Sequence, residues 1–415
     1  MRRGGEGGTV DGMFATPLHR DRTIDALRAV AIAGVVLGHW LVTAVVAGPS
    51  WRGVSPLSSS PGLVPATWVL QTLAPFFFAG GYAAACGLRR RRPWPWLSSR
   101  LSRLSRPVLA FALVWAVILL VLWLTGVPSG TRRLIGSLVI HPLWFLAIFL
   151  VLTALTPLLR AVVARWGVWS ALSPAAVVGL SDVLSSRPPA IVERGAAILP
   201  PHAIGQAGAD LSPVLAMVDV LAGWAVPYLL GIALADRALP RRAGAFLLPV
   251  GVVTCAGLVL IAGYPASAVG VPGDGRSNLA PPTLFAVGLG LAQIGAFLLV
   301  RPWLRRVLER PVVWVPVVVL NLCAMTAYCW HQTAMLLVTF AGGFFGALPG
   351  LHDLPGPGWV AHRLVWLPAF AVVLVVLGVV FHRFERARPG AVRATGGALV
   401  RNVNPDVGIS EPVRS

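Results

Sequence analysis

The first apolar run of this 415-residue chain and the residue just before it carry three ionisable side chains that a helix would place on one side. Arg28 and His39 are 11 residues apart, which at about 100° per residue is three full turns with roughly 20° to spare. They therefore share a helix face and lie about 16 Å apart along its axis, and Asp25 lies on a neighbouring part of that face. Because imidazole changes protonation near neutral pH, His39 is a candidate general base. The alternative is that His39 only hydrogen-bonds to a neighbouring helix.

Two further ionisable side chains, His331 and Asp219, lie inside other apolar runs. Such residues are costly within a membrane unless they meet a partner or a cavity, so they mark candidate functional sites. His331 is interpreted either as an imidazole that orients His39 or the substrate, or as a packing histidine. Asp219 is expected to pair with His39, with Arg28 or with another helix. These three side chains are the candidate catalytic residues.

Arginines repeat at intervals of three residues just before the third apolar run, at Arg100, Arg103 and Arg106. This spacing places three guanidinium groups along one side of a helical turn, and guanidinium is well suited to bidentate contacts with phosphate. The four consecutive arginines at 89–92 are more typical of a topology signal that contacts lipid headgroups.

The composition indicates a membrane protein. Hydrophobic residues make up 56% of the chain and charged residues 12%, about half the roughly 25% of a soluble protein. The net charge is +19, and all 34 basic residues are arginine. They cluster in short links between apolar runs, with no basic stripe of interleaved aromatics, so nucleic acid is not an expected partner. The four cysteines have no CxxC spacing, and neither a zinc site nor any other metal site is expected.

Apolar segments of about 20 residues, each long enough to cross a bilayer, follow one another along the chain. They predict an all-α, polytopic transmembrane bundle of about ten helices. The fifth run is short, and the ninth is overlong, so it is expected either to bend or to consist of two segments. The runs lie near residues 26–47, 63–87, 107–126, 138–159, 168–185, 213–235, 244–264, 281–300, 312–345 and 360–381.

The arginines also predict the orientation of the helices. With ten spans and a cytoplasmic N-terminus, 27 of the 34 arginines fall on the cytoplasmic side, as the positive-inside rule requires. Both termini are therefore expected in the cytoplasm, with the protein in the cell membrane. The first run is too long for the apolar core of a signal peptide, so it is expected to be retained. The predicted organisation is an N-terminal tail (1–22), one integral membrane domain (23–386) and a disordered C-terminal tail (387–415).

Six short motifs in order resemble the acyltransferase-3 family of bacterial membrane proteins, which is associated with O-acylation of sugars and other hydroxyl compounds. The resemblance covers roughly residues 22–386. At Gly80 this sequence departs from the serine that is usual in the family. The motifs are Asp-x-x-Arg-x10-His at 25–39, the Phe-rich stretch at 75–82, Arg-x-x-Arg at 100–103 or 103–106, Leu-Trp-Phe-Leu at 143–146, Tyr-x-x-His at 328–331 and Arg-Phe-Glu-Arg at 383–386.

The resemblance implies an acyltransferase that uses a cytoplasmic acyl-CoA, with acetyl-CoA as the default donor. Its phosphates are expected to bind to Arg28, Arg100, Arg103 and Arg106. His39 would either deprotonate the acceptor hydroxyl or carry the acyl group itself. Supporting roles are expected for Asp25, Trp144, Tyr328 and Glu385. The acceptor would be a sugar, an envelope glycan or a small metabolite, and the sequence predicts no oligomeric state.

Two other classes of protein fit the composition. A transporter or flippase would use intramembrane His, Asp and Arg for proton coupling or substrate passage. It does not require the paired cytoplasmic arginines that a phosphate-bearing donor would use. A non-catalytic membrane scaffold would tolerate replacement of Arg28 and His39.

Overall fold

The computed structural model describes residues 21–90, 92–186, 201–272 and 276–381, and the side chains among these except at 185–186 and 201–213. In this part of the chain, nine helices are long and apolar enough to cross a membrane, or ten if one bent pair counts as a span. The predicted all-α fold with about ten spans is confirmed, with a short β-hairpin added after the first helix. The orientation of the termini stays a prediction.

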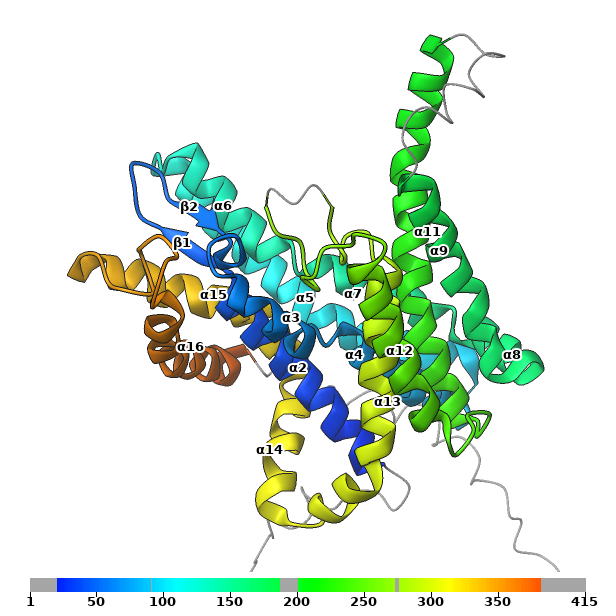
Figure 1. Ribbon diagram of the computed structural model, residues 1–415. Helices are drawn as coiled ribbons and strands as arrows, with labels where there is room; N and C mark the ends of the chain where they lie inside the picture. The colour runs from blue at the N-terminus through cyan, green and yellow to red at the C-terminus, as the bar shows by residue number, and fades with distance from the viewer. Residues whose placement is uncertain (1–20, 91, 187–200, 273–275, 382–415) are drawn as a thin grey trace, which may run out of the picture. The chain divides into compact units, whose positions relative to one another are not determined.

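Helices and two short strands follow one another along the chain (Figure 1). In chain order they are α2 (Arg22–Val42), β1 (Ala44–Val46), β2 (Arg52–Val54), η1 (Pro56–Ser58), η2 (Pro61–Leu63), α3 (Val64–Leu70), α4 (Leu73–Leu88), α5 (Pro93–Leu124), α6 (Ser129–Ile140), α7 (Leu143–Ala154), α8 (Thr156–Trp166), η3 (Gly167–Ala171), α9 (Leu172–Ser186), α11 (Pro201–Ala235), α12 (Ala243–Leu260), α13 (Leu284–Val307), α14 (Pro311–Leu322), α15 (Ala324–Gly342), η5 (Gly343–Phe345) and α16 (Trp359–Phe381).

Helix α2 begins a turn earlier than its apolar run because Asp21 caps it. The Asp21 carboxylate accepts a hydrogen bond from the Thr23 backbone N–H at 3.0 Å and pairs with Arg301 of α13. Capping the first N–H groups stabilises a helix start by about 1 kcal/mol. As a result, Arg28 lies within the second turn of a continuous helix that also carries His39.

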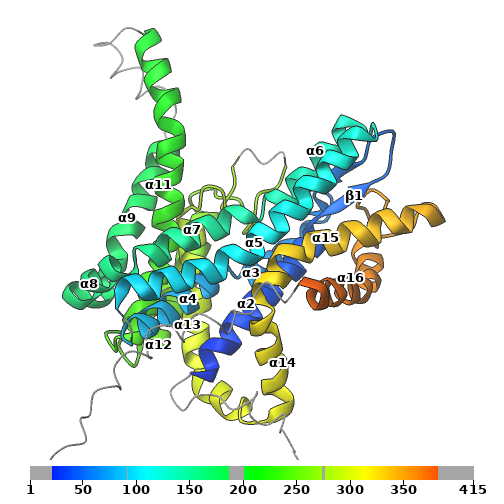
Figure 2. The same ribbon diagram turned by 180° about the vertical axis from the view of Figure 1, so that it is seen from behind.

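The overlong ninth run is broken at Cys323. Helices α14 and α15 meet there at a bend of 78°, which agrees with the expectation of a bend or two segments. Irregular backbone at membrane depth is tolerated where it is buried in protein or lines a cavity. After the break, α15 lies beside α2 and α5 (Figure 2).

Helices α4 and α11 approach closely through a pair of glycines. A Cβ at Gly81 would lie 2.1 Å from the carbonyl oxygen of Tyr228, and one at Gly231 would lie 2.0 Å from that of Phe78. Small residues of this kind let membrane helices pack backbone to backbone. Elsewhere α9 runs beside α11 and α12 beside α13 (Figures 1 and 2).

One arginine of α16 is completely buried. Arg363 donates to the carbonyl oxygens of Trp40 at 2.8 Å, Thr43 at 2.8 Å and Gly350 at 3.0 Å. Two of these carbonyls belong to the C-terminal end of α2, where a cation complements the helix dipole. Arg363 therefore holds the end of α2 that carries His39.

Candidate active site

Helices α2 and α15 bring two imidazole rings together. The ring centroids of His39 and His331 are 5.0 Å apart. His39 is half-buried, whereas His331 is fully buried. The side-chain amide nitrogen of Gln332 lies 3.3 Å from Nδ1 of His39, and the indole N–H of Trp40 donates to the carbonyl of His331 at 2.9 Å. The position of His39 is thus set by residues of α15.

The hydrogen bonds of His331 determine its tautomer. Its Nδ1 lies 2.6 Å from the carbonyl oxygen of Tyr328, and a carbonyl only accepts, so Nδ1 carries the proton. Nε2 is buried and has no hydrogen-bond partner in the described part of the chain. Nδ1 of His331 is therefore a hydrogen-bond donor, and the His331 ring lies next to His39.

A cavity of about 110 Å³, which we call the histidine cavity, opens beside His39. Its walls come from α2, α3, the start of α7, Tyr328 of α15 and the segment before α13. Of the residues with predicted supporting roles, Trp144 and Tyr328 both line it. The Tyr328 hydroxyl donates to the carbonyl of Pro142, so this side chain fixes the start of α7 against α15.

A second cavity, of about 270 Å³, gathers three of the four predicted donor-binding arginines. Arg106 is exposed and does not line this arginine cavity. The spacing of three residues therefore brings Arg100 and Arg103, rather than Arg103 and Arg106, to the cavity. Its lining residues are Arg28, Arg100, Arg103, Leu104, Phe149, Asn321, Leu322, Ala324 and Met325.

The helix break adds a further electropositive group to the arginine cavity. Ala324 and Met325, the first two residues of α15, line it. The first N–H groups of a helix have no partner within the helix and carry partial positive charge. Asn321, at the end of α14, donates to the backbone carbonyl of Asp25 at 2.8 Å and so ties the break to α2. Asp25 is itself buried there.

Each cavity is lined by one of two neighbouring aromatic rings of α7. Phe145 lines the histidine cavity and Phe149 the arginine cavity, and their rings are stacked at 6.4 Å. Phe149 also explains the departure at Gly80, because a Cβ there would lie 2.4 Å from its ring. A serine at position 80 would require this ring to move.

Two predicted residues are not among these groups. Asp219 accepts a hydrogen bond from Ser181 of α9 and lines neither cavity, so it pairs with another helix rather than with His39 or Arg28. Glu385 lies outside the described residues, as does the rest of its motif.

The sequence reasoning missed Gln332 and Asn321 as site residues. Both are polar amides within the ninth apolar run, and the same argument that singled out His331 would have found them. No three His, Cys, Asp or Glu side chains gather as a metal site requires among the described residues, and the absence of a metal stays a prediction.

Most of the chain matches one known protein family. Residues 21–383 match the acyltransferase-3 family, described as an acyltransferase domain. None of the curated proteins and none of the solved structures matches the chain significantly. The family match includes both cavities and extends over most of the chain, which a transporter or scaffold interpretation does not explain. The chain therefore belongs to the acyltransferase-3 family and is a multi-pass membrane acyltransferase.

Proposed function

We propose that this protein moves an acyl group, acetyl by default, from cytoplasmic acyl-CoA to a hydroxyl of a sugar, an envelope glycan or a small metabolite. One observation carries the proposal. A single face of α2 presents Arg28 to a cavity of three arginines and His39 to a second cavity about three turns further on. The membrane domain 23–386, in the cell membrane with cytoplasmic termini, is proposed to carry the activity.

The arginine cavity suits the polyanionic part of the donor. Coenzyme A carries a pyrophosphate and a 3′-phosphate, and guanidinium binds such groups through paired, charge-assisted hydrogen bonds. The N-terminus of α15 adds backbone N–H donors of the kind that bind phosphate. No carboxylate is among the described residues that line this cavity. Arg28, Arg100 and Arg103 are the proposed phosphate ligands.

The pantetheine arm would bridge the two cavities. Arg28 and His39 are about 16 Å apart along α2, and the rings of Phe145 and Phe149 lie between the cavities. Passage of the arm requires these rings to turn aside. The thioester would then lie beside His39, and the acceptor would enter the histidine cavity.

The proposed chemistry uses His39 as a general base. The acceptor oxygen attacks the thioester carbonyl carbon, and Nε2 of His39 takes the hydroxyl proton. The C–S bond breaks, and the imidazolium returns its proton to the departing thiolate, giving an ester and free CoA. In the alternative route, His39 carries the acyl group briefly. The imidazole first displaces CoA to form an acyl-imidazole, and the acceptor hydroxyl then takes the acyl group from His39.

Gln332 is proposed to position His39 and to select its tautomer. Turning the amide by a half-rotation places its oxygen beside Nδ1, a change that leaves the heavy-atom positions the same. The amide oxygen then accepts the Nδ1 proton of His39, and Nε2 keeps its lone pair for the acceptor hydroxyl. The His331 ring packs against that of His39.

The test is acetyl-CoA turnover by the purified protein in nanodiscs, with crude envelope extract as the source of acceptor. Wild type is compared with His39→Ala and Arg103→Ala, and free CoA and radiolabelled product are both measured. Turnover by wild type that is lost in His39→Ala supports the proposal. If acetyl-CoA neither binds nor reacts and all three proteins behave alike, the proposed donor and site are wrong.

A further inference from the structure

Three polar groups that line the histidine cavity are already used within the protein. The Thr67 hydroxyl donates to the carbonyl of Val64 at 2.6 Å and accepts from the backbone N–H of Ala268 at 3.0 Å. The Tyr328 hydroxyl donates to the carbonyl of Pro142. The Gln71 amide oxygen accepts from the backbone N–H of Leu73 at 2.9 Å. These groups have little capacity left for a ligand.

The side chains that can still hydrogen-bond to a ligand are few. They are the imidazoles of His39 and His141, the amide nitrogen of Gln71 and the indole N–H of Trp144. In the described part of the chain, no Asp, Glu, Asn, Arg or Ser lines this cavity, and the other lining side chains are aliphatic or phenyl groups, with Pro142. A pyranose bears a hydroxyl on nearly every ring carbon, and each one buried without a partner is unfavourable.

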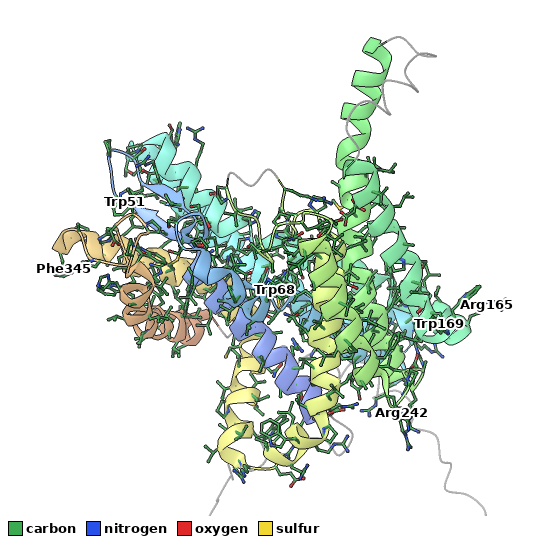
Figure 3. All side chains as sticks on the ribbon, viewed as in Figure 1. Trp51, Trp68, Arg165, Trp169, Arg242 and Phe345 are labelled. Atoms are coloured by element: carbon green, nitrogen blue, oxygen red, sulfur yellow. The ribbon has the colours of Figure 1, made fainter. Side chains whose placement is uncertain are left out.

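One apolar wall of this cavity is fixed by side-chain hydrogen bonds to the backbone. Val269 and Leu279 form part of it, and both lie in the segment between α12 and α13. Asn278 anchors that segment by donating to the carbonyls of Pro265 at 2.7 Å and Ser267 at 2.8 Å. Trp68 of α3, labelled in Figure 3, donates to the carbonyl of Ala266 at 2.7 Å. The mostly apolar character of this wall is thus fixed by the fold.

We infer that the acceptor is an alcohol whose hydroxyl is attached to an apolar ring or chain, rather than a sugar or a glycan. This inference rests on the proposed function, because it takes the histidine cavity as the place where the acceptor reacts. The cavity, at about 110 Å³, is smaller than the roughly 300–1,000 Å³ of sites that enclose a whole drug-sized ligand. It receives the reactive end of the acceptor, and His39 meets the single hydroxyl there.

Two small acceptors that share the same reactive group test the inference. Cyclohexylmethanol and methyl glucoside both carry a CH₂OH group on a six-membered ring, but only the sugar ring bears further hydroxyls. With purified wild type in nanodiscs and radiolabelled acetyl-CoA, ester formation and CoA release are measured for each. Each unpaired ring hydroxyl is expected to lower kcat/KM by roughly tenfold, so cyclohexylmethanol should be preferred by about 100-fold or more.

The two ways of failing are distinguishable. CoA release with methyl glucoside at a rate equal to or above that with cyclohexylmethanol overturns the inference and leaves the acyltransfer from CoA intact. No CoA release with any acceptor, including envelope extract, overturns the proposed function and the inference with it.

Two glycine substitutions test whether the preference for an apolar acceptor arises in this cavity. Gly38 lines the cavity, and a Cβ there would lie 3.5 Å from Leu70 Cβ, an ordinary contact that the fold accommodates. Gly38→Ala adds one methyl group to the apolar wall and takes space from the acceptor. It should therefore lower kcat/KM for cyclohexylmethanol by roughly tenfold or more. Gly257→Ala on α12, where nothing lies within 4 Å of the added Cβ, should leave it unchanged. Equal effects of the two variants would place the acceptor elsewhere.

Discussion

The arginine cavity and the histidine cavity lie along the same helix, yet their lining side chains differ in charge and polarity. The first has about 270 Å³ and is lined by three guanidinium groups, an asparagine and the start of α15. The second has about 110 Å³ and combines imidazoles with aliphatic and aromatic walls. Charge that binds phosphate would perturb an imidazole base placed beside it. In the proposed function, the separation along α2 lets one protein hold a polyanionic donor and keep a neutral base in an apolar setting.

The difference has a direct consequence for mutations. If the two cavities divide binding and chemistry between them, a change in one must spare the function of the other.

The largest effect is expected from His39→Ala. Loss of the general base should lower kcat by about 10²- to 10⁴-fold while the affinity for CoA stays unchanged, since His39 does not line the arginine cavity. Steady-state kinetics and CoA binding in nanodiscs measure the two quantities. His362→Ala, an exposed histidine of α16, is the control and should retain wild-type kcat. Wild-type kcat in His39→Ala would remove His39 from the mechanism.

Arg103→Gln should act on the donor alone. Removing one charge-assisted contact is expected to raise KM for acetyl-CoA by about 10- to 100-fold. The kcat/KM for acetyl-pantetheine, which lacks the pyrophosphate and the 3′-phosphate, should not change. Arg106→Gln is a closely matched control because Arg106 is exposed one turn further along α5 and lies outside the cavity. Equal losses with both donors would mean that Arg103 does not bind phosphate.

Gln332→Leu should lower kcat by about tenfold, the value of one hydrogen bond that orients the base, without changing KM for acetyl-CoA. Gln332→Glu keeps an oxygen that can accept the Nδ1 proton of His39, so it should recover part of the lost kcat. Steady-state kinetics of the two variants measure this. Recovery by neither, together with a raised KM, would indicate a purely structural role.

Asp21→Asn should have the smallest effect, and it depends on pH. Burial raises the pKa of the Asp21 carboxyl, but the hydrogen bonds from Thr23 and the charge and hydrogen bond of Arg301 lower it more, so it lies below its usual value. A lowered folded-state pKa contributes stability above the unfolded pKa that is lost as the pH falls through the folded pKa. Asn can still cap the helix but loses the charge that pairs with Arg301, so thermal unfolding at pH 7 should show a loss of about 1 kcal/mol in Asp21→Asn. The loss should shrink on acidification toward pH 3, and a pH-independent difference would contradict this explanation.

Helical periodicity predicted the relation between Arg28 and His39 from the sequence because both belong to one uninterrupted helix. It could not predict that Arg100 and Arg103 line the same cavity as Arg28 while Arg106 does not, since that depends on how α2 and α5 both pack against α15. The position of Asp219 has the same cause, because Ser181 becomes its partner only when α9 packs on α11.

The apolar pattern of the sequence could not predict two features of the structure. Hydropathy showed the ninth run as overlong, but the bend that brings Asn321 to one cavity and Gln332 to His39 depends on tertiary packing. Arg363 is one of the seven arginines that the charge count places off the cytoplasmic side, yet it is buried against the end of α2. A charge count does not distinguish a headgroup contact from a buried hydrogen-bonding group.

The most direct test of the division between the cavities is the equilibrium affinity for CoA of the purified protein in nanodiscs. Wild type, His39→Ala and a variant with Arg28, Arg100 and Arg103 all changed to Gln are compared at one salt concentration. The expected result is that His39→Ala binds CoA as wild type does, whereas the triple variant binds at least 100-fold more weakly. A triple variant that binds CoA as tightly as wild type would contradict the account.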